Sequence, residues 1–366
     1  MIGGYPKENW SNSHYLRRVL YSIAARPLTA SLGFLYGGVL FNVLLSLFAF
    51  YLYRRFLEHR FKPSTSKWGL WLLALYPGIF YWIGLPYHHA SIVPLCLIQF
   101  FLMSRFYEDQ QASGKNVWML FLLFGVLGLS YDLLPIFAGS LALLVIEKKL
   151  WRFLPTALPL ALLPSILVNR TLSLFVETEN ANSKIIPTII KSYANWSQSD
   201  LWWKEIKEVP RVLFLNFFDS NFWTLPSLFL LFLIFSHRVL LNKSYRPALY
   251  LLITIAGLFF FNNLAPPYPG WQLRGTWIAR IYQPMFVPLI MFVLISFDEL
   301  RKNTNRLALM RTALALTVIL NVWTIFGGIT GAPQLSNLVY HRFYMHSPKP
   351  VYSENLKKLG RRPLGF

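Results

Sequence analysis

Long apolar stretches run through this chain, and the loops between them are alternately basic and nearly uncharged. Of the 366 residues, 55% are hydrophobic and only 14% are charged, which leaves too little polar surface for a water-soluble fold of this size. The pattern predicts an all-α, polytopic transmembrane protein with about ten membrane-embedded helices. The expected helices lie at residues 31–53, 68–84, 90–103, 117–130, 133–146, 153–168, 222–235, 247–261, 278–297 and 307–329.

The net charge of +20 would suit an acidic partner such as nucleic acid, but the placement of the charge argues against one. Basic residues gather in four short loops, around Arg55, Lys149, Lys243 and Lys302. The positive-inside rule holds for short loops and places these four in the cytoplasm. We therefore expect a multi-pass integral membrane protein with membrane lipid as a partner and no nucleic acid. A bacterial inner membrane is favoured over the endoplasmic reticulum.

Three regions follow from this topology. Residues 1–30 form an interfacial segment on the outer face, because apolar side chains within residues 14–28 recur every three or four positions. This segment either anchors the chain or grips an anionic lipid headgroup. Residues 31–330 form the transmembrane domain, with a long outer loop at residues 169–221. Residues 331–366 form a basic extramembrane tail.

An outer N-terminus requires Lys7, Arg17 and Arg18 to cross the membrane ahead of the first apolar stretch. No signal segment precedes them to carry them across. The sequence therefore predicts a missing upstream helix. Either the reading frame begins before Met1, or a partner subunit or an unusual insertion route supplies what is missing.

Several stretches are shorter than the roughly 20 residues of a straight spanning helix. The shortest pairs flank two outer turns, at residues 86–89 and 131–132. Each pair is expected to form two short helices that meet at a polar turn, or a re-entrant hairpin. A single broken helix per pair is the alternative.

Polar residues in these outer turns are the first candidates for a functional site. The adjacent His88 and His89 suit contact with a substrate phosphate, whereas two neighbouring imidazoles rarely hold a metal by themselves; a plain interfacial turn is the alternative. Asp132 is the acid most tightly enclosed by apolar sequence, where a carboxylate is costly. It is either a functional group or the structural ion-pair partner of Arg274 or Arg280. No metal site and no certain cofactor is predicted, and a divalent cation is left open.

Two outer loops supply further candidates. The proline-rich loop at residues 262–271 has a fixed shape, because proline locks the backbone. Arg274, Arg280 and Tyr282 follow it, where guanidinium groups can bind phosphate bidentately; snorkelling to lipid headgroups is the alternative. The tryptophans within residues 169–221 form either an interfacial belt or a sugar-stacking platform.

Four sequence elements occur in a familiar order along the chain. They are Tyr15-Leu16-Arg17-Arg18, the stretch from Tyr76-Pro77 to Tyr87, Phe124-Gly125-Val126-Leu127-Gly128-Leu129, and Arg280-Ile281-Tyr282-Gln283-Pro284-Met285-Phe286-Val287-Pro288. Their order, over most of the chain, resembles the GT-C superfamily of membrane glycosyltransferases. These enzymes use lipid-phosphate sugars and include protein mannosyltransferases and lipid A aminoarabinose transferases.

The resemblance implies transfer of a sugar from a polyprenyl-phosphate donor to an acceptor on the extracytoplasmic face. Such a reaction needs a carboxylate to deprotonate the acceptor and cations to hold the departing lipid phosphate. The resemblance assigns the base to Asp132 or to Glu8, the acid that remains before the first apolar stretch. It assigns phosphate binding to Arg274, Arg280 and His88 or His89, with Tyr282 beside them and with Arg17 and Arg18 at the lipid entrance.

A second class of function stays open beside this one. The chain would then be a non-catalytic membrane subunit, or a transporter or polymerase of lipid-linked glycans. A transporter built from broken helices would carry polar sites near the bilayer midplane. The charged residues here gather toward the outer edge instead, which favours chemistry at the surface over transit.

Overall fold

The computed structural model describes residues 19–84, 88–131, 133–173, 224–236, 245–263, 283–302 and 304–330. In these segments every regular element is a helix and none is a strand. The α-helices are α1 (Val19–Arg60), α2 (Pro63–Ala74), α3 (Pro77–Ile83), α4 (Ile92–Glu108), α5 (Gly114–Gly128), α6 (Leu134–Glu147), α7 (Leu154–Ser173), α11 (Thr224–Phe235), α12 (Arg246–Asn263), α14 (Phe286–Glu299) and α15 (Thr304–Thr330). Short 3₁₀ turns join some of them: η2 (His88–Ser91), η3 (Trp151–Phe153), η8 (Gln283–Met285) and η9 (Leu300–Lys302). Each expected apolar stretch is therefore mostly helical where the structure describes it.

Four helical segments in the described residues are long and apolar enough to cross a membrane: Val19–Arg60, His89–Glu108, Trp151–Val168 and Thr304–Trp323. The other apolar helices, such as α5 and α6, are shorter. Large apolar side chains cover the outward faces of the peripheral helices, for example Leu47, Leu162 and Ile319. Exposed apolar faces of this extent suit contact with lipid rather than water.

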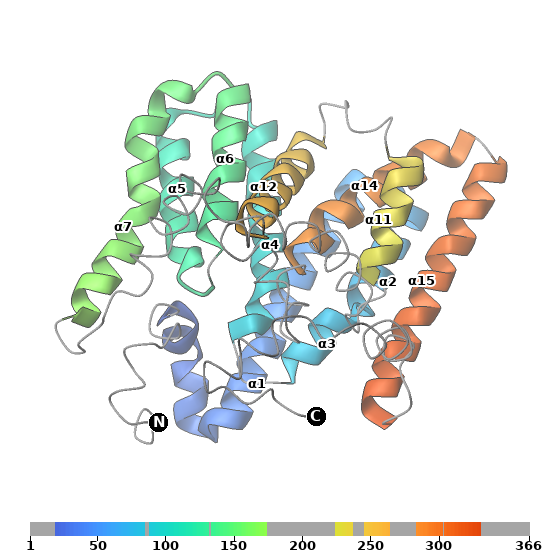
Figure 1. The fold of residues 1–366 in the computed structure, drawn as a ribbon, viewed down its shortest axis with the longest axis horizontal. Coiled ribbons are helices and arrows are strands. Elements are labelled where there is room, and N and C mark those ends of the chain that lie inside the picture. Colours follow the sequence, from blue (N-terminus) through green and yellow to red (C-terminus); the bar gives the residue numbers. More distant parts are fainter. Residues whose placement is uncertain are drawn as a thin grey trace, which may run out of the picture.

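Helix α1 is a hairpin that folds back on itself at Gly33 (Figure 1). Gly33 has a φ of 79°, in the left-handed region that glycine adopts without strain. The Tyr21 hydroxyl donates a hydrogen bond to Oδ1 of Asn42 over 2.7 Å, and the Tyr21 ring meets Phe41 edge-on at 5.3 Å. In a straight helix residues 21 and 42 would lie about 30 Å apart. The two legs therefore pack against each other.

The sequence placed a boundary near residue 30, between an interfacial segment and the first spanning helix. The structure places the bend at Gly33 and adds the antiparallel packing of the first leg, which the sequence did not predict. Close approach is possible because Gly37 lies directly against the backbone of Leu28 and Thr29. The second leg, residues 34–60, alone exceeds the ~20 residues that a span requires.

The stretch expected at residues 68–84 is two helices, α2 and α3. The break falls at Leu75 and Tyr76, just before Pro77, because proline disfavours helical backbone in the residue that precedes it. The pair around residues 131–132 consists of two separate helices, α5 and α6, which lie side by side (Figure 1). The single-broken-helix alternative is therefore wrong for that pair.

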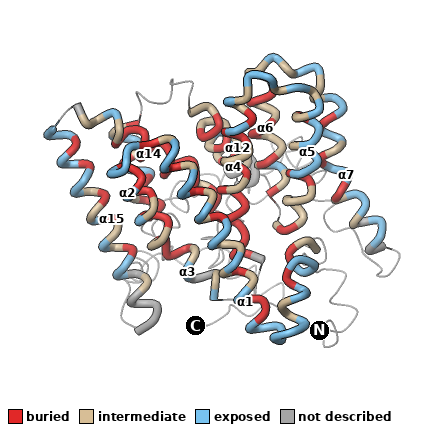
Figure 2. Tube along the Cα trace, turned by 180° about the vertical axis from the view of Figure 1, so that it is seen from behind, coloured by how far each residue is buried: buried red, intermediate tan, exposed pale blue. Residues whose placement is uncertain are grey.

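Helix α14 is the centre of the bundle. Every residue from Phe286 to Phe297 is buried, and α14 packs against α2, α4, α11 and α12. Figure 2 shows α14 as the most continuously buried helix, while α15 and α7 at the two sides of the molecule are largely exposed. A helix that is apolar on all sides must be covered by other apolar groups, and here neighbouring helices cover it.

Helices α5, α6 and α7 form one side of the molecule (Figure 1). Helix α7 packs mainly against α5, where Gly125 touches the backbone of Ala161. Small residues of this kind allow the backbones of membrane helices to approach closely. Most of the apolar surface of α7, including Leu158 and Ile166, stays exposed.

Candidate functional site

Contacts between distant segments bring three of the basic loops and the start of α12 to one end of the helical bundle, which we call the basic end; the loop around Lys243 lies outside the described residues. Arg60, the last residue of α1, forms an ion pair with Glu108 at the end of α4 (Nη1 to Oε1, 2.6 Å). Arg246, at the start of α12, lies 3.4 Å from a carboxylate oxygen of Glu147 at the end of α6. The α6–α7 and α14–α15 connections lie along the upper edge of Figure 1. The α1–α2, α6–α7 and α14–α15 connections are thus on one side, together with the start of α12, which follows the loop around Lys243.

Lys148 ties the end of α6 to the end of α4. Its Nζ donates hydrogen bonds to the carbonyl oxygens of Phe106, Tyr107 and Asp109, at 3.0, 2.9 and 2.6 Å. The last carbonyls of a helix have no partner within the helix, and a cation there also interacts favourably with the helix dipole. Burial lowers the pKa of the Lys148 ammonium, and the nearby Asp109 carboxylate acts in the opposite direction.

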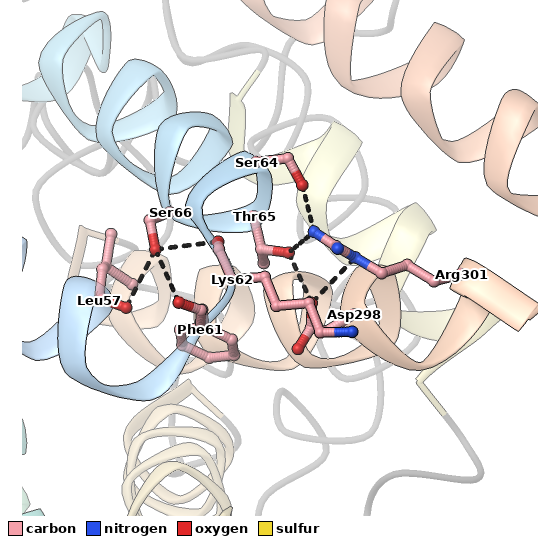
Figure 3. Close-up of polar contacts among 8 residues, drawn as sticks. All are labelled: Leu57, Phe61, Lys62, Ser64, Thr65, Ser66, Asp298 and Arg301. Carbon is pink, nitrogen blue, oxygen red and sulfur yellow. Dashed lines mark hydrogen bonds and ion pairs between the residues drawn. The ribbon is translucent and has the colours of Figure 1, made fainter.

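A second polar cluster joins the start of α2 to the end of α14 (Figure 3). The Thr65 hydroxyl donates to Oδ1 of Asp298 over 2.8 Å, and Nε of Arg301 lies 3.1 Å from the same oxygen. Arg301 also donates to the hydroxyls of Ser64 and Thr65. Ser66, buried beside them, donates to the carbonyl oxygen of Leu57 over 3.0 Å. These bonds satisfy polar groups within the protein, so we assign the cluster a structural role.

The opposite end of the bundle holds the expected site residues that the structure describes. His89 lies in η2 with 2% of its surface exposed, and its ring meets the Tyr131 ring at 5.5 Å and 63°. Tyr131 immediately precedes Asp132, and Leu133 on the other side is buried. The histidine turn and the Asp132 turn, far apart in sequence, are therefore neighbours in space.

A third expected segment reaches the same end. Gln283, which follows Arg280 and Tyr282 in the chain, is buried in η8, and η8 packs against α4 and α12. Phe286, in the next turn, stacks on Tyr76 with ring centroids 4.2 Å apart and planes within 6°. The described residues that flank the candidate segments thus converge near the start of α4, at the end of the bundle opposite the basic end.

Several expected site residues lie outside the described residues. They are Glu8, Arg17, Arg18, Asp132, Arg274, Arg280 and Tyr282. His88 is described only as part of the η2 backbone. The roles predicted for these residues, and the alternative ion pair between Asp132 and Arg274 or Arg280, stay predictions.

The described part of the chain offers no metal centre and no substrate-sized cavity at the basic end. No group of three His, Cys, Asp or Glu side chains is placed to hold an ion there or elsewhere in the described segments. A cavity of about 10 Å³ lies at the basic end, lined by Arg60, Glu108 and Tyr245 among others. That volume holds one water molecule. The loops at residues 169–221 and 262–277, expected on the opposite side, lie almost wholly outside the described segments.

Sequence reasoning missed several polar residues that join helices to one another. Glu147 accepts hydrogen bonds from the hydroxyls of Tyr107 and Tyr250, over 3.2 and 2.5 Å, and so joins α4, α6 and α12. In the bundle interior, Nε2 of Gln99 donates to Oγ of Ser140 over 2.6 Å. A lone Gln within an apolar stretch was the available signal for this second pair, because an amide in such a position must find a partner.

Comparison of the chain with protein-family models, with curated proteins and with solved structures finds no match. A proposed function therefore depends on the geometry above and on the resemblance of the sequence elements.

Proposed function

We propose that the chain is a multi-pass integral membrane protein of the GT-C type that transfers a sugar from a polyprenyl phosphate to an acceptor outside the cytoplasm. The observation that carries the proposal is the convergence at the end opposite the basic end. The ring of His89 lies beside Tyr131, next to Asp132, and Gln283 packs nearby at the end of the segment that contains Arg280. A carboxylate and cations near one another are what such a transfer requires.

In the proposed reaction the acceptor oxygen or nitrogen attacks the anomeric carbon of the donor sugar. Asp132 takes the proton from the acceptor, the bond from the anomeric carbon to the phosphate oxygen breaks, and the electron pair leaves with the polyprenyl phosphate. Arg274 and Arg280 stabilise the negative charge that develops on this leaving group. In this proposal His88 or His89 contacts the donor phosphate, and the contact of the His89 ring with Tyr131 supports this by bringing the histidine turn beside the Asp132 turn.

The proposal fixes the orientation of the protein in its membrane, a bacterial inner membrane in our assignment. The basic end lies in the cytoplasm, because short basic loops are retained there. The end that holds His89 then faces outward, where the donor and the acceptor meet.

The orientation predicts the result of cysteine labelling. Cys96 is buried and is the single cysteine of the chain, so Cys96→Ser provides the background. We expect cysteines at Arg55, Lys149, Lys243 and Lys302 to react with a membrane-impermeant thiol reagent only from the cytoplasmic side. Cysteines at Asn195, Trp271 and Lys357 should react from the other side. Labelling of the Lys149 and Trp271 positions from one and the same side would end the model of alternating loops.

Binding of the donor lipid tests the proposed site itself. We expect the purified protein to bind a polyprenyl phosphate, and the double variant Arg274→Ala, Arg280→Ala to bind it at least ~10-fold more weakly, since hydrogen bonds to charged groups contribute about 1.5–3 kcal/mol each. The matched control is Arg274→Lys, Arg280→Lys, which keeps the charge and removes the bidentate geometry. Full binding in the lysine variant would identify the arginines as headgroup anchors, and unchanged binding in the alanine variant would rule out this site.

A further inference from the structure

Three exposed cations lie on segments that pack together at the basic end, on the side of the molecule formed by α5, α6 and α7. They are Lys115 at the start of α5, and Lys149 and Arg152 in the connection from α6 to α7; we call them the basic corner. Within the described residues none of the three forms an ion pair with an acid. Like charges on neighbouring segments attract an anion.

The two acids nearest in sequence to these cations bind other groups. The Asp109 carboxylate accepts hydrogen bonds from the backbone N–H of Gln111 and from Nδ2 of Asn116, over 2.9 and 3.2 Å. Glu147 is engaged by Arg246 and by two tyrosine hydroxyls. Neither of these two described acids forms an ion pair with a cation of the basic corner.

Packing around Phe153 holds the corner together. The Arg152 guanidinium lies over the Phe153 ring, 4.9 Å from its centroid, and the Trp118 ring meets the same ring edge-on at 5.8 Å. The backbone of Gly114, the neighbour of Lys115, abuts the Phe153 ring as well. Trp118 also donates from Nε1 to Oγ1 of Thr156 over 2.9 Å, which fixes the start of α5 against the start of α7.

Apolar surface continues from the corner along the two helices. Leu122, one turn beyond Trp118 on α5, is exposed, and so are Leu158 and Leu162 on α7. Two tryptophans, Trp118 and Trp151, are exposed beside the cations. Tryptophan favours the boundary between lipid headgroups and acyl chains, and lysine and arginine bind lipid phosphates at that depth. A free phosphate ion would use the cations but not the apolar faces.

We propose that the basic corner binds the phosphate of an anionic phospholipid from the leaflet that faces the basic end. The acyl chains of this lipid lie along the exposed faces of α5 and α7. The proposal rests on the membrane embedding proposed above and is independent of glycosyl transfer. The lipid covers the face of α7 that does not pack against α5, the main neighbour of α7.

The test uses the full chain in nanodiscs of phosphatidylcholine, with or without phosphatidylglycerol, and measures the melting temperature and the lipids retained in native mass spectrometry. We expect the wild-type protein to melt higher with phosphatidylglycerol. The triple variant Lys115→Gln, Lys149→Gln, Arg152→Gln should lose this difference, with an affinity for phosphatidylglycerol about 100-fold weaker, on the basis of the usual contribution of each cation near an anionic surface.

A matched control removes the same charge from the same end. Arg55→Gln, Lys62→Gln, Lys67→Gln changes three other exposed cations, and this variant should keep the wild-type preference. Equal loss in both triple variants, or no preference in the wild-type protein, would overturn the lipid site. The readout is the difference in melting temperature between the two lipid compositions. A general loss of stability in either variant lowers both melting temperatures and leaves this difference unchanged. Failure to reconstitute into nanodiscs at all would contradict the membrane embedding instead.

Discussion

Replacing Asp132 by Asn is expected to lower the rate of glycosyl transfer by a factor of about 10²–10⁴ while the protein still folds and inserts. The factor is that usually lost with a general base, because the amide keeps the shape of the carboxylate and cannot accept the acceptor's proton. The flanking residues support a site of this kind, since Tyr131 contacts the buried His89 and Leu133 is fully enclosed. Yield, melting temperature and transfer rate, all measured on the same purified variant, check the expectation.

Asp109→Asn is the matched control for this experiment. Asp109 lies at the basic end, where its side chain accepts hydrogen bonds from Gln111 and Asn116, and an amide oxygen can accept the first of these. Transfer should stay at the wild-type level. Full activity in Asp132→Asn would remove Asp132 from the mechanism, and a loss of yield and melting temperature with residual activity would identify a structural carboxylate.

Gly125→Ala is expected to destabilise the protein by about 1–3 kcal/mol, the usual cost of forcing an added methyl into a packed interface. A Cβ at residue 125 would collide with the carbonyl oxygen of Ala161 and would lie 3.0 Å from its carbonyl carbon. Both are backbone atoms and cannot rotate away, so α5 and α7 must separate. Thermal melting in detergent, or resistance to proteolysis of α7, measures the effect.

The same substitution in a different helix is the control. Gly257 lies on an exposed face of α12, and a Cβ added there meets no atom within 4 Å. Alanine forms helix better than glycine by about 1 kcal/mol, so Gly257→Ala should leave the melting temperature unchanged or raise it. Equal melting of the two variants would show that contact between Gly125 and Ala161 does not hold α5 against α7.

Much of the candidate site could be located from sequence only as separate pieces. A histidine pair in a short turn and an acid between apolar stretches can be recognised along the chain. They stand out because placing a polar residue in apolar surroundings costs free energy. Their proximity was not visible, since no local pattern links His89 to Tyr131. The partners of Glu147 on α4 and α12 were hidden for the same reason.

The sequence by itself determined where helices form and which loops are basic, because hydropathy and charge are properties of each segment taken alone. The break between α2 and α3 is also a local effect, since a proline acts on the residue before it, although one stretch was expected at residues 68–84. Only the tertiary structure decided that α1 folds back at Gly33 and that α14 lies at the centre while α7, which is also long and apolar, lies at the side. Burial of an apolar helix depends on which neighbours cover it, and those neighbours are contributed by parts of the chain that are far apart in sequence.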